Sequence, residues 1–172
     1  MSLPVRDALR TLLLRELRAT RRELERYPDD ASVWRAVPGI PNTGGTLALH
    51  LAGNLQHFFG AAIDRDGYVR DRDAEFARRD VPRAELLAEL DKAAIAVERA
   101  ISRLSDEQLA AVYPLPIPPS PTGRVDTLVW LMHLASHLAY HLGQIDYHRR
   151  VVTGDAAGVD ALSVRELPSS GG

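Results

Sequence analysis

The sequence contains no cysteine among its 172 residues. This absence excludes disulfides, zinc sites built on thiolates, iron–sulfur clusters and a cysteine nucleophile. Positive and negative charges are also nearly balanced. The sequence has 21 Lys and Arg and 23 Asp and Glu, which give a formal net charge of −2. Such a balanced chain has no bulk electrostatic attraction to nucleic acid or anionic membranes, so we expect neither as a partner.

Several enzyme motifs are also missing. The sequence has no G-x-G-x-x-G, no P-loop and no G-x-S-x-G elbow. No signal peptide is expected either, because Arg6, Asp7 and Arg10 interrupt the first apolar stretch, and we therefore expect a cytoplasmic protein. Residues 36–63 and 127–145 lack Asp, Glu, Lys and Arg, but prolines or histidines interrupt both stretches. We interpret them as interior helices rather than membrane spans.

Apolar residues recur at helical spacing in four long segments. These segments cover about residues 4–27, 46–63, 80–104 and 126–151. A short helix opened by a Ser105 cap is expected over 105–111, and the charged stretch 64–80 is expected to be an exposed connection with some helical character. No convincing strand alternation occurs. The sequence therefore predicts an all-α four-helix bundle with long inter-helix loops over residues 1–154, followed by a loosely ordered tail, residues 155–172.

All six histidines lie in the second and fourth segments, where charged residues are nearly absent. They are His50, His57, His133, His137, His141 and His148. Two histidines four residues apart on one helix can chelate one ion, and both His133/His137 and His137/His141 have this spacing. A neighbouring helix can supply a third ligand, for which His50 is the better placed. Three neutral imidazoles leave coordination positions open, as in catalytic metal sites.

The alternative is that these imidazoles are hydrogen-bonded core residues. Asp146 is the one nearby carboxylate that can pair with them, and this scarcity of carboxylates favours the metal interpretation. We expect His57 and His148, which lie near the segment ends, to be structural. A di-iron carboxylate bundle is excluded because the second and fourth segments contain no Glu. Imidazole ligands suit Zn, Ni, Fe or Cu.

Two motifs resemble the DinB/YfiT-like superfamily. They are GTLALHLAGNLQHFFG at 45–60 and HLASHLAYHLGQIDYHRR at 133–150, the second of the form H-x-x-x-H-x-x-x-H-x-G-Q. The resemblance extends over about residues 5–153. It implies a DinB-like four-helix bundle, commonly a homodimer, with a divalent ion held by His50, His137 and His141 and with His133 outside the ligand set. Tyr140 stands where many members have His, and Leu142 where Arg is frequent, but neither difference removes a ligand.

The resemblance also implies an activity. Characterised members include metal-dependent transferases that use low-molecular-weight thiols such as bacillithiol or mycothiol, and a mycothiol-dependent isomerase. It therefore implies a metal-dependent thiol transferase, or a metal-dependent hydrolase, acting on a small-molecule substrate. Because the chain has no cysteine, the sulfur would arrive on the cosubstrate. The alternatives are a non-catalytic, stress-associated protein that binds a metal or small ligand, and a metal-free helical dimer with core histidines.

Several neighbouring residues have two interpretations. Gln144 and Asn54 lie about one turn past His141 and His50, where they can orient the imidazoles or satisfy backbone groups. Tyr140 is a proton donor or packs against its neighbours. Trp34 walls a cleft or plugs the core. The segment 4–27 is a candidate dimer surface.

Overall fold

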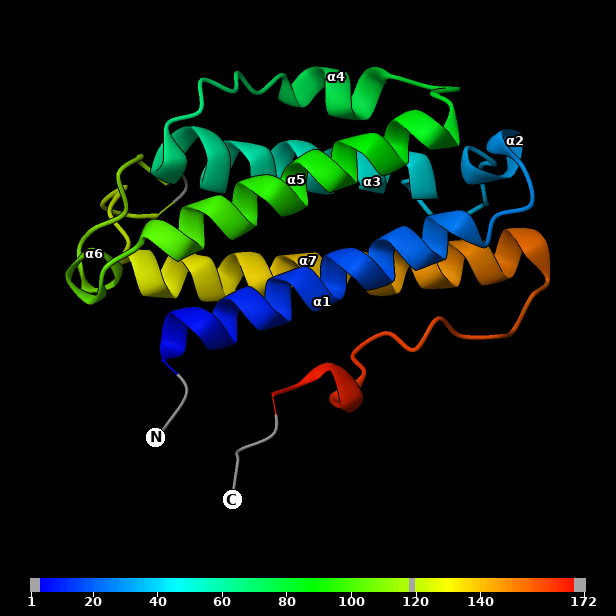
Figure 1. Ribbon diagram of the computed structural model, residues 1–172. Coiled ribbons are helices and arrows are strands. Elements are labelled where there is room, and N and C mark those ends of the chain that lie inside the picture. Colours follow the sequence, from blue (N-terminus) through cyan, green and yellow to red (C-terminus); the bar gives the residue numbers. More distant parts are fainter. Residues whose placement is uncertain (1–3, 118–119, 169–172) are drawn as a thin grey trace.

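The chain folds into helices and connecting loops over residues 4–117 and 120–168, which the computed structural model describes (Figure 1). The long elements are α1 (Val5–Glu25), α3 (Gly44–Leu55) continued by the π-helix η1 (Gln56–Asp64), α5 (Arg83–Arg103) and α7 (Thr127–Thr153). Both α1 and α3 pack against α5 and against α7. The all-α prediction is confirmed.

Short helices join the long ones. They are α2 (Asp30–Val33), α4 (Arg72–Ala77), α6 (Asp106–Ala110) and the 3-10 helix η2 (Val164–Glu166). The predicted Ser105 cap opens α6: Ser105 Oγ accepts from the Gln108 backbone N–H at 3.2 Å, and the Gln108 side chain accepts from Ser105 N–H at 2.9 Å. Within the described part of the chain, no helix combines the length and apolar character that a membrane span needs.

The buried face of α7 consists mainly of branched aliphatic residues, in agreement with the predicted interior helix. Its fully or nearly fully buried members are Leu131, Leu134, Leu138, Leu142 and Ile145. Burial of these side chains fixes the rotation of α7 about its axis, because apolar burial is the main favourable term in folding. His137 and His141 each lie three residues after one of these leucines, so they lie at the edge of the buried face.

Two glycines open α3 and allow close packing there. Thr43 caps the helix, with its Oγ1 accepting from the Thr46 backbone N–H at 3.2 Å. A Cβ on Gly45 would lie 2.6 Å from the ring of Trp34, and one on Gly44 would clash with the Tyr27 hydroxyl. Gly44 and Gly45 therefore begin the helix itself and let two aromatic side chains pack directly on the backbone of α3.

The helix predicted over residues 46–63 changes geometry part of the way along. It is α-helical to Leu55, and from Gln56 to Asp64 its backbone hydrogen bonds follow the wider π pattern. The π-helix ends at Arg65, which has a left-handed backbone (φ 57°). Segments of π-helix are frequent at functional sites. This one carries His57 and Phe58 and directly follows α3, the helix that bears His50.

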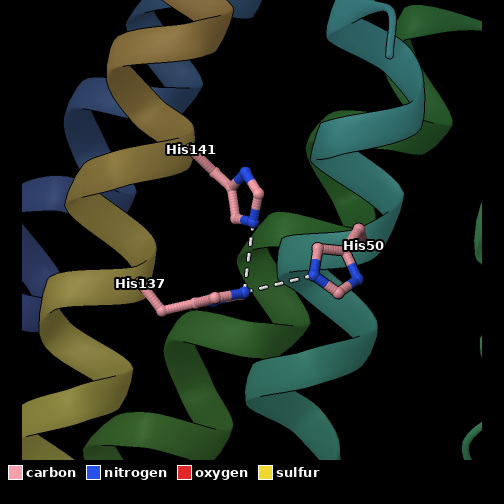
Figure 2. Close-up of side chains that lie close together, drawn as sticks. All are labelled: His50, His137 and His141. Carbon is pink, nitrogen blue, oxygen red and sulfur yellow. Dashed lines mark hydrogen bonds between the residues drawn. The ribbon is translucent and has the colours of Figure 1, made fainter. Parts of the chain in front are cut away.

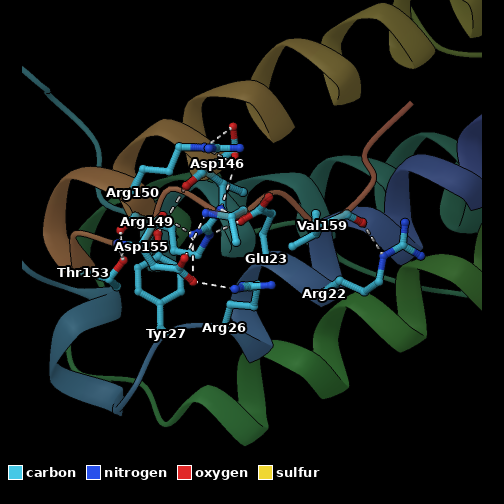
Figure 3. A network of polar contacts seen from close by, with 12 residues as sticks. Arg22, Glu23, Arg26, Tyr27, Asp146, Arg149, Arg150, Thr153, Asp155 and Val159 are labelled. Atoms are coloured by element: carbon cyan, nitrogen blue, oxygen red, sulfur yellow. Dashed lines mark hydrogen bonds and ion pairs between the residues drawn. The ribbon is translucent and has the colours of Figure 1, made fainter. Parts of the chain in front are cut away.

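A buried ionic network joins α1, α7 and the start of the tail (Figure 3). Arg149 on α7 is fully buried and pairs with Glu23 of α1, while its Nη2 donates to Asp146 Oδ1 at 3.0 Å. Its guanidinium also donates to the backbone carbonyls of Asp155 at 2.9 Å and Ala157 at 2.7 Å. Asp146, which the sequence offered as a partner for the histidines, therefore pairs with arginines instead.

The described part of the tail lies along α1. Arg22 Nε donates to the Val159 carbonyl at 3.0 Å, and Arg18 pairs with Glu166 at 2.7 Å. The side chains of Val159 and Ser163 are buried. The predicted division into a domain, 1–154, and a tail, 155–172, stays a prediction, and residues 1–3, 118–119 and 169–172 of these ranges lie outside the described residues.

Candidate metal centre

Three histidines from two helices converge on one point (Figure 2). His137 Nε2 lies 3.3 Å from His50 Nε2 and 3.1 Å from His141 Nε2. All three nitrogen atoms lie within 4.8 Å of one another. A tetrahedral zinc ion with Zn–N distances of about 2.0–2.1 Å holds pairs of ligand nitrogens about 3.3 Å apart. The cluster therefore fits a divalent ion, with His50 supplied by α3 and the other two by α7.

The ring of His50 is oriented by a buried carboxylate. His50 Nδ1 lies 2.9 Å from Glu75 Oε2, and Arg70 forms two further hydrogen bonds to the same carboxylate, at 2.6 and 2.8 Å. Burial raises the pKa of Glu75, but the hydrogen bonds from Arg70 and His50 outweigh it, and the pKa lies below its usual value. An ionised carboxylate only accepts hydrogen bonds, so His50 Nδ1 donates and the Nε2 lone pair faces the cluster.

Glu75 reaches His50 because of a glycine on α3. A Cβ added to Gly53 would lie 2.8 Å from the carboxyl carbon of Glu75. The carboxylate therefore occupies the space that any other residue at position 53 would fill. Asp71 caps α4, accepting from the Ala74 backbone N–H at 2.9 Å, and this cap starts the short helix that carries Glu75.

The sequence alone did not reveal this part of the site. The charged stretch 64–80 was expected to be an exposed connection, and this is wrong for Glu75, which is buried, and for Arg70, whose side chain is mostly buried. The helical character expected in this stretch is confirmed by α4, which the Asp71 cap begins. No local pattern indicated that Glu75 would meet a histidine 25 residues earlier in the chain.

The ring of His141 has a partner on its own helix. Its Nδ1 lies 2.6 Å from Gln144 Oε1. With Nδ1 donating to this amide oxygen, the Nε2 lone pair of His141 also faces the cluster. Gln144 is thus one of the two amides that the sequence placed near the histidines. The other, Asn54, is buried on α3, and its Oδ1 has no hydrogen-bond partner among the described residues.

Other candidate residues lie around the cluster without joining it. His133 is exposed and stacks on Trp130, with ring centroids 4.9 Å apart, and its ring lies 6.2 Å from that of His137. His57 on η1 is half-buried against Phe58. The side chain of Tyr140 is 66% exposed, and its ring centroid lies 5.2 Å from that of His141.

His148 and Trp34 have structural surroundings. The buried His148 donates from Nε2 to the Arg35 carbonyl at 2.9 Å and accepts from the Tyr27 hydroxyl at Nδ1, at 2.7 Å. Both of its nitrogens are therefore occupied. Trp34 is buried, and its Nε1 donates to the Val81 carbonyl at 3.0 Å. Of its two interpretations, a plug in the core agrees with this burial.

The surroundings of His137 and His141 favour their neutral imidazole forms, because both pKa values are lowered. Burial, together with the neighbouring His141 and His50, lowers the pKa of His137 to about 3. Burial also lowers the pKa of His141, although the bond to Gln144 opposes this shift. Metal binding requires neutral imidazole, so protons compete little with a cation here near pH 7. Three nitrogen ligands of this kind suit Zn, Ni, Fe or Cu and leave further coordination positions for other ligands.

Comparison with known proteins places the chain in a family. A search of curated proteins found no match. A scan against protein families matched residues 12–145 to the DinB superfamily. The match covers well over half of the chain and contains the whole three-histidine cluster. The chain therefore belongs to the DinB superfamily.

Proposed function

We propose that the chain is a divalent-metal-dependent enzyme, with a Zn, Ni or Fe ion held by His50, His137 and His141. The observation that carries this proposal is the convergence of three Nε2 atoms at 3.1 and 3.3 Å separations. For two of the rings, an acceptor at Nδ1 turns the Nε2 lone pair toward the common point. Both of these lone pairs face His137 Nε2, and the Nδ1 of His137 is buried with no hydrogen-bond partner among the described residues, so no neighbouring group fixes the tautomer of this third ring.

Within this proposal, the reaction is the transfer of a low-molecular-weight thiol, of the bacillithiol or mycothiol kind, to a small electrophile. A bound divalent ion supplies positive charge that stabilises a thiolate, or activates water if the reaction is instead a hydrolysis. Glu75 keeps the proton on His50 Nδ1, and Gln144 does the same for His141. If the reaction uses a sulfur nucleophile, that sulfur must come from an external thiol, because the chain has no cysteine.

A non-catalytic role is the second candidate. It is favoured because no described acid or base beside the three histidines is free to transfer a proton. The buried Glu75 carboxylate is already hydrogen-bonded to both His50 and Arg70. Tyr140 lies beside His141, but most of its side chain is exposed. In this alternative, the chain is a stress-associated protein that binds a metal or a small ligand without turnover.

We also propose that the protein is a homodimer that associates through the outer face of α7. That face carries the exposed apolar residues Val129, Met132, Tyr140, Tyr147 and Val151. Tyrosine side chains offer about 150–250 Å² each. A stable interface buries roughly 800 Å² per partner, and large aromatic side chains such as these supply much of that area. The earlier candidate, α1, is less suitable because residues 155–168 lie along it. The cytoplasmic location stays a prediction.

The test of the proposed activity is thiol conjugation measured with and without a chelator. Purified protein is incubated with bacillithiol or mycothiol and 1-chloro-2,4-dinitrobenzene, a generic electrophile. We expect turnover that EDTA abolishes and added Zn²⁺ restores, with loss of activity in His137→Ala and retention in the matched variant His57→Ala. Stoichiometric metal binding without turnover of either thiol, or of a water-labile ester, would favour the non-catalytic role.

A further inference from the structure

An open pocket of about 260 Å³ lies next to the histidine cluster. Its walls are residues 39–42 of the loop before α3, Leu47 of α3, and Gln144 and Tyr147 of α7. Leu47 comes three residues before His50 on α3, and Gln144 comes three residues after His141 on α7. Gln144 connects the pocket with the histidine cluster, because it lines the pocket and hydrogen-bonds to His141.

The loop wall of the pocket is held in shape by a tight turn. Ile40 N–H donates to the Val37 carbonyl at 3.0 Å. Between them Gly39 has φ 79°, a left-handed conformation that side chains other than glycine rarely adopt. Thr43 then caps α3 directly after the turn. The turn and the cap fix both ends of this short wall, so Ile40 and Pro41 face the pocket from a defined position.

The lining combines apolar walls with three uncharged polar side chains, Asn42, Gln144 and Tyr147, of which Gln144 lies beside the cluster. Ile40, Pro41 and Leu47 contribute apolar side chains, and none of the described residues that line the pocket is Asp, Glu, Lys, Arg or His. Gln144 Oε1 accepts from His141, and its Nε2 has no hydrogen-bond partner within residues 4–117 and 120–168. That amide nitrogen is therefore available to donate to an acceptor at the end of the pocket nearest the histidines.

We infer that this pocket binds the substrate of the proposed enzyme as an uncharged molecule with a compact apolar group and a neighbouring acceptor oxygen. The apolar group lies against Ile40 and Leu47, and the oxygen accepts from Gln144. A charged group is disfavoured because it would lose water without gaining a counter-charge from the walls. The substrate role depends on the proposed function, whereas the ligand class depends only on the lining of the pocket.

Benzamide is a suitable probe, because it joins a small ring to an uncharged carbonyl. Metal-free, EDTA-treated protein is titrated and followed by two-dimensional ¹H–¹⁵N spectra. We expect shifts at the backbone amides of Ile40 and Leu47 and at the Gln144 side-chain amide, with a Kd on the order of 1 mM for so small a ligand. Benzoate and benzylamine, which have similar shape but carry charge, should bind at least about tenfold more weakly.

Variants of Ile40 test the position of the ligand. Ile40→Trp fills the pocket and should weaken benzamide binding about tenfold or more. The matched control Ile95→Trp, at an exposed site on α5, should leave it unchanged. Ile40→Asp adds a carboxylate to the walls and should reverse the preference, so that benzylamine binds more tightly than benzamide.

The outcomes separate this inference from the proposed function. No shift at these residues with 20 mM benzamide, which is about twenty times the expected Kd, or equal binding by Ile40→Trp and the wild type, would overturn the inference. Binding of Zn²⁺ by the same preparations is measured in parallel, and we expect Ile40→Trp to bind as much as the wild type. If the protein binds zinc but does not bind benzamide, the inference about the pocket is refuted and the proposed function is not. Benzamide bound by a protein that takes up no divalent ion would refute its role in the proposed enzyme.

Discussion

Glu75 determines which nitrogen of His50 faces the cluster. Its carboxylate, paired with Arg70, holds the proton on His50 Nδ1. We expect Glu75→Ala to lower zinc affinity by about 10–100-fold, the usual effect of removing such a partner of a ligand. Competition titration against a chromophoric chelator measures this affinity. Glu85→Ala, which removes an exposed carboxylate on α5, is the matched control and should bind as the wild type does. Equal affinities for the two variants would contradict this role of Glu75.

Glu23 makes a contribution to the free energy of unfolding that depends on pH. Burial raises its pKa from 4.5 to about 6, against the opposing effect of Arg149. The folded state therefore binds more protons than the unfolded state between these two values. The stabilisation is complete below about pH 4.5, disappears as the pH rises through 6, and amounts to about 2 kcal/mol.

Urea unfolding of the wild type and of Glu23→Gln at pH 4.5 and pH 7 isolates this contribution. We expect the wild type to lose about 2 kcal/mol relative to the variant between the two pH values. The comparison cancels most groups that titrate equally in both proteins. A difference that stays constant or increases with pH would show that the pair with Arg149 keeps Glu23 ionised throughout.

At the scale of elements, the contact between α4 and α3 depends on Gly53, which has no side chain. A Cβ on Gly53 would overlap the Glu75 carboxylate. Gly53→Ala should therefore cost about 1–3 kcal/mol of stability, as overpacking does, and should also weaken zinc binding by displacing Glu75 from His50.

Gly143→Ala on α7 is the matched control for Gly53→Ala. A Cβ there meets nothing within 4 Å, so the variant should be as stable as the wild type or more stable by about 0.5–1 kcal/mol. Chemical denaturation and zinc titration of both variants provide the two measurements. Wild-type zinc affinity in Gly53→Ala would mean that α4 does not control the site.

Local periodicity was enough to predict α1, α5 and α7, because their apolar stripes match the faces that they bury. The Ser105 cap predicted α6 in the same way. Periodicity could not show the change to π geometry at Gln56, because α- and π-helices place apolar residues at similar spacing over one or two turns. It also missed the burial of Glu75, since charged residues near it suggest exposure and its partners lie in other segments.

The same limits apply to the candidate site. The four-residue spacing of His137 and His141, together with His50 on a neighbouring helix, was sufficient to predict the cluster that the structure brings together. Gln144 was found because it lies one turn from His141. Arg70 and Glu75 could not be found, because their approach to His50 depends on the space left by Gly53, which only the packing of α4 on α3 reveals.

At the scale of the whole molecule, the proposed dimer makes a prediction about mass in solution. Tyr140→Arg places a charge in the exposed apolar face of α7, and in a two-fold interface that charge occurs twice. We expect light scattering to give a dimer mass for the wild type and a monomer mass for this variant. Leu12→Arg, at a partly exposed apolar position on α1, is the control and should remain dimeric. A monomeric wild type, or a dimer that only Leu12→Arg disrupts, would refute the α7 interface.

The central claim is that the three histidines hold one divalent ion. It is tested most directly by elemental analysis of protein purified without a histidine tag, as isolated and after loading with Zn²⁺ and dialysis. The account predicts about one ion per chain, nearly none in His137→Ala, and the wild-type amount in His57→Ala, whose histidine lies outside the cluster. A metal content far below one per chain after loading, or one that His137→Ala leaves unchanged, would contradict the account.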